Sequence, residues 1–93
     1  MTVTNTTTNH IEVGGLYQTT ADGLILAYKN DQPERSEFRM KPEYVFTIIE
    51  EVEFPTRLYK FVRVLMANTG KFQLLHKSDL EIFLSRNFIK RIG

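Results

Sequence analysis

With 93 residues and no cysteine, the chain can bury one modest core, and it excludes a disulfide framework and a thiolate metal site. Hydrophobic residues at 42% and charged residues at 25% are typical of a globular domain, and no apolar run approaches the ~20 residues that a membrane helix needs. The start of the chain lacks the basic residues and apolar run of a signal peptide, so we expect a cytoplasmic protein that does not enter a membrane.

The net charge of +1 conceals an uneven distribution of charge along the chain. Up to Glu53 there are nine acidic and four basic residues, whereas from Phe54 onward there are eight basic and two acidic residues. This asymmetry has two interpretations, a basic binding face in the second half or acidic and basic strands that neutralise one another across a sheet. The second interpretation is the simpler one.

The first ten residues, Met1 to His10, are rich in Thr and Asn and have little to bury, so we expect a disordered tail before a single domain over residues 11–93. Ile11–Val13 alternates like a strand. Gly14 and Gly15 then break this pattern, which indicates a bulge or a sharp bend.

Two short strands and a long loop are expected next. Leu16–Thr20 has β-propensity, the turn signal Ala21–Gly23 follows, and Leu24–Tyr28 is an apolar strand. From Lys29 to Pro42 charge and proline dominate, which predicts a mobile surface loop.

The second half of the chain predicts a strand followed by a tight hairpin. Tyr44–Glu53 begins with the most hydrophobic run and turns polar at its end, as a central strand that leaves the core would do. Leu58–Met66 and Lys71–Leu75 flank the turn Ala67–Gly70, in which Asn and Gly tolerate the positive φ of a hairpin. Lys60 and Arg63 have opposite parity, so either a bulge interrupts that strand or both of its faces are covered.

The last segment has two competing interpretations. Ser78 and Asp79 favour one short helical turn near His76–Leu80, with strands at Ile82–Leu84 and Phe88–Ile92. Alternatively a helix runs from Ser78 to Ile89, because its apolar residues fall at helical spacing. In either case the core is expected to contain Phe46, Ile48, Val52, Val64, Leu74, Leu75 and Leu80.

This order of features resembles an SH3-like barrel over Ile11 to Ile92. That fold has a first strand, a long hairpin excursion, a second strand ending in acidic residues, a tight hairpin, a single 3₁₀ turn and a closing strand. The resemblance implies an all-β fold, a small barrel of about five strands with a long first loop and a 3₁₀ turn before the last strand. Peptide-binding SH3 domains carry a Trp, a Pro and a Tyr in their groove, whereas this chain has no Trp and has His76 and Asp79 at the other two positions. The chain is more similar to the SH3-like domains of bacteria and their phages than to peptide-binding SH3 domains.

Residue types that support catalysis or metal binding are few. The two histidines, His10 and His76, are far apart in the chain, so we expect no metal site and no cofactor. His76, Ser78 and Asp79 are of hydrolytic residue types, but three groups on one tight turn have no scaffold to hold a nucleophile against a base. We prefer the interpretation that Ser78 or Asp79 caps the turn, and we expect the protein to have no catalytic activity.

Two functional hypotheses remain. The first is a protein-interaction module, such as a small phage-like regulator or inhibitor that binds a macromolecular partner. Its candidate anchors are Tyr17, Tyr28, Phe38 and Tyr59. The alternative is a nucleic-acid-binding barrel that uses the basic second half of the chain. Its candidate contacts are Arg57, Lys60, Arg63, Lys71 and Lys77.

Overall fold

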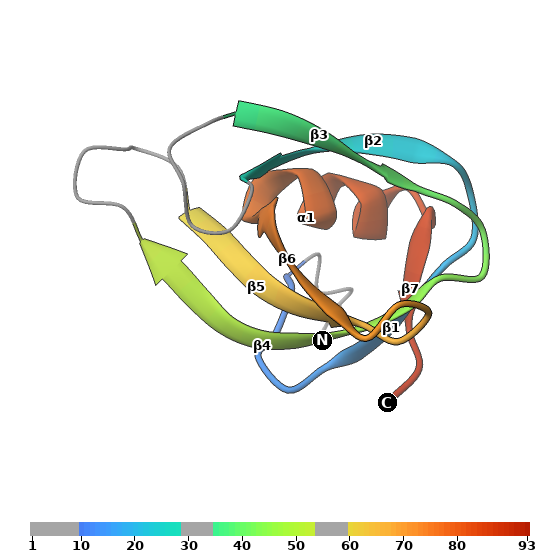
Figure 1. Ribbon diagram of the computed structural model, residues 1–93. Helices are drawn as coiled ribbons and strands as arrows, with labels where there is room; N and C mark the ends of the chain where they lie inside the picture. The colour runs from blue at the N-terminus through green and yellow to red at the C-terminus, as the bar shows by residue number, and fades with distance from the viewer. Residues whose placement is uncertain (1–9, 29–34, 54–59) are drawn as a thin grey trace, which may run out of the picture.

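The computed structural model describes residues 10–28, 35–53 and 60–93, and these form one curved antiparallel sheet with one helix (Figure 1). Seven strands and the helix follow one another along these described residues. They are β1 (Leu16–Thr19), β2 (Gly23–Tyr28), β3 (Arg35–Met40), β4 (Val45–Glu53), β5 (Lys60–Met66), β6 (Lys71–His76), α1 (Lys77–Ser85) and β7 (Ile89–Arg91).

The strand order in the sheet is β3-β2-β6-β5-β4-β1-β7. The expected hairpin is present as β5 and β6, and Gly70 in its turn has a φ of 71°. Strand β1 lies between β4 and β7, so the first and last strands of the chain are neighbours. Among the described residues no backbone pairing joins β3 to β7, which are the two ends of the sheet.

Three of the sequence predictions are wrong in whole or in part. The expected loop Lys29–Pro42 contains β3, in which exposed Glu37 and Arg39 alternate with the half-buried Phe38 and the buried Met40. The charges that indicated a loop therefore occupy one face of a strand. The sheet also has seven strands instead of about five, and Ile11–Val13 forms no strand. The expected tail up to residue 9 and the residues 29–34 lie outside the described part of the chain.

The expected 3₁₀ turn is replaced by α1, a nine-residue α-helix. The competing helical interpretation is therefore right for Ser78–Ser85, but the helix does not reach Ile89, which begins β7 within the expected strand Phe88–Ile92. The helix ends in a Schellman motif, because the N–H of Phe88 donates to the carbonyl of Phe83 and that of Asn87 to Leu84. Asn87 has the positive φ that this motif requires, 62°. The rings of Phe83 and Phe88 pack edge to face, with their centroids 5.6 Å apart. These contacts stop the helix and direct the chain into β7.

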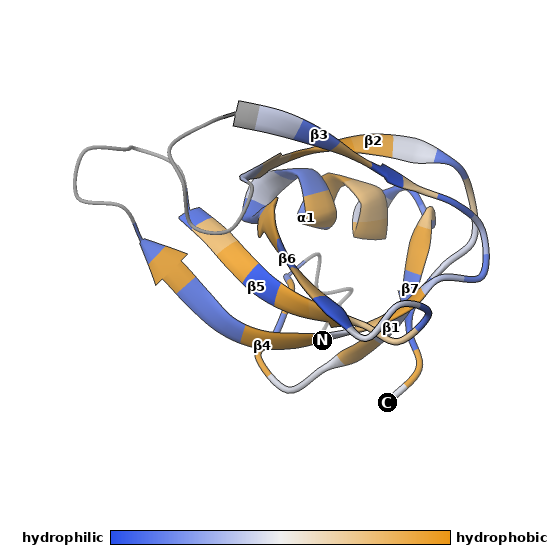
Figure 2. Cartoon of the chain, in the orientation of Figure 1, coloured by the Kyte–Doolittle hydropathy of each residue, from blue (hydrophilic) through white to orange (hydrophobic). Residues whose placement is uncertain are grey.

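The main core lies between α1 and the concave face of the sheet, which is the face turned toward the helix (Figure 1). Strand β5 is hydrophobic along most of its length, with one hydrophilic interruption (Figure 2). Both of its faces are covered, since Phe61 and Val62 are each buried. Six of the expected core residues are buried, namely Phe46, Ile48, Val64, Leu74, Leu75 and Leu80.

Val52, the seventh expected core residue, lies on the other face of the sheet. A register shift in β4 between Ile48 and Glu50 reverses the parity of the strand, so Val52 pairs with Phe61 and not with the main core. It packs against a second cluster on this convex face, formed by Tyr28, Phe61 and Leu74. The sheet therefore buries apolar side chains on both faces.

Gly23 at the start of β2 has no room for a side chain. A Cβ atom there would lie 2.3 Å from the Cζ of Phe83 on α1. We expect Gly23→Ala to destabilise the fold by about 1–3 kcal/mol, because the Phe83 ring, which packs edge to face on Phe88, would have to move. Urea unfolding measures this loss. Gly23→Ala in a Phe83→Leu background is the control, and an equal loss in both backgrounds would contradict the close approach of β2 and α1.

Candidate functional site

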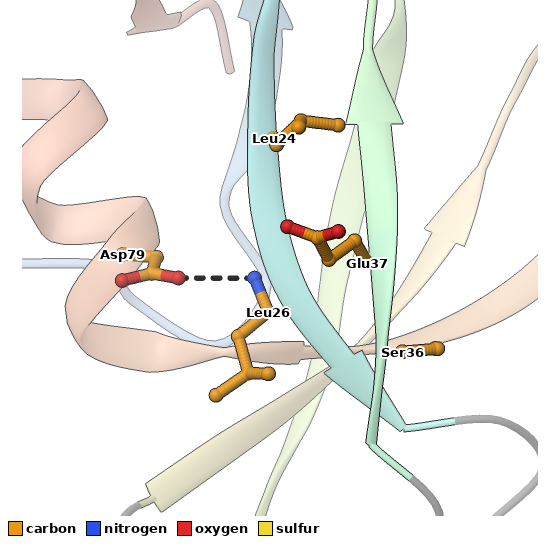
Figure 3. Close-up of a pocket in the computed structure, with 5 residues that line it drawn as sticks. All are labelled: Leu24, Leu26, Ser36, Glu37 and Asp79. Carbon is orange, nitrogen blue, oxygen red and sulfur yellow. Dashed lines mark hydrogen bonds between the residues drawn. The ribbon is translucent and has the colours of Figure 1, made fainter.

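A groove of about 480 Å³ lies beside the hairpin of β2 and β3, and Figure 3 shows the side chains that line it. Leu24 and Leu26 come from β2, Ser36 and Glu37 from β3, and Asp79 from the first turn of α1. Asp79 is far in the sequence from the four residues of the hairpin. The groove therefore exists only because the hairpin lies next to the start of the helix.

The position of the hairpin is fixed by an exchange of partners along β2. Strand β2 pairs with β6 only at Ala27 and Tyr28, because β6 ends at His76 and the chain continues as α1. The N–H of Leu26 then donates to the Asp79 carboxylate at 3.0 Å (Figure 3). A side chain of the helix thus provides the acceptor that a neighbouring strand would otherwise supply.

The groove combines apolar and acidic groups. Leu24 and Leu26 alternate with the buried Ile25 and Ala27, so their side chains project from the convex face, and Leu24 is 49% exposed. Glu37 is the cross-strand partner of Leu26 and is exposed. Within the described residues no ion pair engages Glu37. This lining suits an aliphatic group next to a cation.

The histidine and carboxylate at the start of α1 have structural roles. His76 is the N-cap residue, but its side chain makes no capping hydrogen bond, and neither Ser78 nor Asp79 occupies the cap position. The expected capping by Ser78 or Asp79 is therefore wrong, since the Asp79 carboxylate reaches Leu26 instead. His76 Nδ1 lies 3.2 Å from Asp79 Oδ1, and the imidazole is buried against Phe61 with ring centroids 5.4 Å apart. In the described part of the chain, no three His, Asp or Glu side chains gather as a metal ion would require.

The aromatic anchors expected from the sequence lie mainly in the core. Tyr17 is 1% exposed and stacks on Phe46, and Tyr28 is 4% exposed and stacks on Phe61. Phe38 is partly buried against the main core, and Tyr59 lies outside the described residues. Because both rings are buried in the core, Tyr17 and Tyr28 are not exposed anchors for a binding partner, and we correct that assignment.

The basic residues expected at a nucleic-acid face are largely neutralised by carboxylates of β4. Lys60 lies 3.6 Å from Glu51 and 3.8 Å from Glu53. Arg63 donates to Glu50 at 2.6 Å. Lys77 lies 3.3 Å from Glu51, Lys71 is exposed at the hairpin turn, and Arg57 is outside the described residues. The interpretation that acidic and basic strands pair across the sheet is confirmed for these contacts.

Comparison of the chain with protein families, with curated proteins and with solved structures finds no match. The described residues include no helix with the length and apolar character needed to span a membrane. The groove itself is thus the main basis for a functional conclusion.

Sequence reasoning misses the groove residues because each has a simpler interpretation. Leu24 and Leu26 fit an apolar strand, and Glu37 fits a charged loop. The available signal is alternation, since the charged Glu37 and Arg39 alternate with the apolar Phe38 and Met40, as in a strand with one covered face.

Asp79 is expected to hold β2 against the helix. Asp79→Ala should destabilise the protein by about 1–3 kcal/mol, because the N–H of Leu26 loses its acceptor. Asp79→Asn keeps a carbonyl oxygen and should cost less. Urea unfolding and amide exchange at Leu26 measure both effects, with Ser78→Ala as the control on the exposed neighbour. Equal stability of Asp79→Ala and Ser78→Ala would contradict this role.

Nucleic-acid binding is expected to be weak. Because Lys60 and Arg63 are already paired with glutamates, the triple variant Arg57→Ala, Lys60→Ala, Arg63→Ala should bind single- and double-stranded DNA much as the wild type does. A salt titration of binding checks this. Tight wild-type binding with a steep salt dependence that the triple variant loses would establish the basic strands as a nucleic-acid face.

Proposed function

We propose that this chain is a non-enzymatic protein-interaction module that holds a segment of a partner protein in the groove between the β2–β3 hairpin and α1. The observation that carries the proposal is the lining of this groove, in which leucine side chains lie next to carboxylates. A small regulator or inhibitor that acts by binding alone would need a site of this kind.

An SH3-like architecture is the scaffold that we propose for this module. In its support, the strands β7-β1-β4-β5-β6 are consecutive neighbours, as the first, second, hairpin and closing strands of that fold would be. The hairpin of β2 and β3 occupies the long excursion between the first two of these strands. The helix α1 stands where such a barrel has a single 3₁₀ turn. This longer element supplies Asp79 to the groove.

The chemistry of the groove indicates the partner. Leu24 and Leu26 offer apolar surface, and the carboxylates of Glu37 and Asp79 favour a cation beside it. We therefore expect a peptide segment in which a Lys or Arg lies close to an aliphatic residue. The nucleic-acid alternative has less support, since the described cations of β5 and α1 are paired with Glu50, Glu51 and Glu53.

Selection of peptides from a random display library tests the proposal. We expect enriched peptides to combine an aliphatic residue with Lys or Arg and to perturb the amide NMR signals of the groove residues. Leu24→Ser should weaken their binding about tenfold, the effect of a hot-spot side chain.

Ile92→Ser is the matched control, because Ile92 is 46% exposed and lies beyond β7, away from the groove. Replacement of the basic residue in the peptide by alanine should also weaken binding. Failure to select any peptide, or equal effects of Leu24→Ser and Ile92→Ser, would reject the groove as the binding site.

A further inference from the structure

Strand β3 forms an open edge of the sheet. Its only hydrogen-bonded neighbour among the described residues is β2, and the turn and loop hydrogen bonds include none to residues 36–40. The opposite edge is β7, which is only three residues long. An exposed edge of six residues is a template on which another strand can pair.

The contact between Leu26 and Asp79 determines which backbone groups of β3 face outward. Because the N–H of Leu26 points to Asp79, away from β3, Leu26 and Glu37 are a pair that exchanges no hydrogen bonds. In such a pair both residues direct their N–H and C=O groups away from each other. The backbone groups of Glu37, and by alternation those of Arg39, therefore point to the open edge.

We propose that the edge strand β3 pairs antiparallel with β3 of a second copy of this chain, about a twofold axis at Phe38. In this register Glu37 lies opposite Arg39 of the second copy, and Arg39 opposite Glu37. Both residues direct their backbone groups outward, so each of these two pairs exchanges two hydrogen bonds. The register thus satisfies the backbone of both strands at once.

Charge complementarity selects this register over its neighbours. Glu37 and Arg39 are exposed on the same face, and no ion pair engages either of them within the described residues. With the axis at Phe38 their opposite charges meet twice across the interface. Moving the axis to Glu37 or to Arg39 would place identical charges opposite each other. Arg35 and Lys41 are both cationic residue types and would meet at the ends, which confines the pairing to Ser36–Met40.

The apolar residue at the centre also suits self-pairing. Phe38 is half-buried on the concave face, where it packs against the main core. In the proposed dimer the two Phe38 residues form the closely spaced pair without hydrogen bonds, with Cα atoms about 4.5 Å apart. Their rings would extend the core of each subunit across the axis.

This dimer goes beyond the proposed peptide-binding function and is tested separately from it. The two grooves would lie on one continuous convex face, on either side of the axis. Because Glu37 lies opposite Arg39 of the second copy in this dimer, Asp79 is the groove carboxylate that the pairing leaves for a peptide cation. Leu24, the residue that tests the groove, is outside the paired strand. A protein that dimerises without binding peptides, or binds peptides as a monomer, would separate the two proposals.

Charge reversal provides the test. Light scattering and sedimentation should show a wild-type dimer, and Glu37→Arg and Arg39→Glu should each weaken self-association at least about tenfold, since like charges then meet twice. An equimolar mixture of these two variants should form a heterodimer, because one chain then carries a cation at both positions and the other chain an anion at both. The double variant Glu37→Arg, Arg39→Glu should again form a homodimer.

Lys90→Glu on the opposite edge of the sheet is the control for general electrostatic effects and should leave the dimer intact. Circular dichroism establishes that each variant is folded. A wild-type chain that remains monomeric at its highest soluble concentration would overturn the proposal. Loss of dimer in both single variants without recovery in their mixture would overturn the register.

Discussion

The hydrogen bond from the backbone N–H of Leu26 to the Asp79 carboxylate is the interaction on which the position of the β2–β3 hairpin depends. Strand β6 ends at His76, so within the described part of the chain no strand lies beside β2 from Gly23 to Leu26 on the side away from β3. Helix α1 takes that place, with Asp79 as the acceptor and Phe83 over Gly23. The hairpin of β2 and β3 is held by the helix at one end and by β6 at the other. The groove and the open edge of β3 both result from this position.

Much of the sheet could be predicted because local patterns and tertiary structure agree in it. The hairpin turn that contains Gly70 and the strand from Val45 to Glu53 follow directly from turn residues and apolar runs. The segment after His76 is ambiguous in sequence, since its apolar residues fit both a turn followed by strands and a helix. The deciding interactions are the left-handed Asn87 and the contact of Phe83 with Phe88, and these depend on how the segment packs.

The candidate site could be predicted to a smaller extent. Large aromatic residues are the usual anchors of an interface, but in a domain of this size they are also the residues that best fill the core. Tyr17 and Tyr28 serve the core here. Glu37 and Asp79 line the same groove only because β2 pairs with β3 on one side and contacts the start of α1 on the other. No local sequence pattern encodes this arrangement. Strand β3 resembles a loop in sequence when its charges are counted without their alternation.

The irregularity in β4 after Ile48 has a consequence for how the protein tolerates changes in chain length. Before this point the strand turns Phe46 and Ile48 toward the helix, and after it Val52 faces the opposite cluster with Phe61. The single extra residue reverses the alternation of side chains between the two faces, so one strand contributes to both apolar clusters. Loss of that residue would exchange the two faces of Glu50–Glu53, moving carboxylates and Val52 to the wrong sides of the sheet. The length of this segment is therefore as strict a requirement of the fold as the identity of its residues.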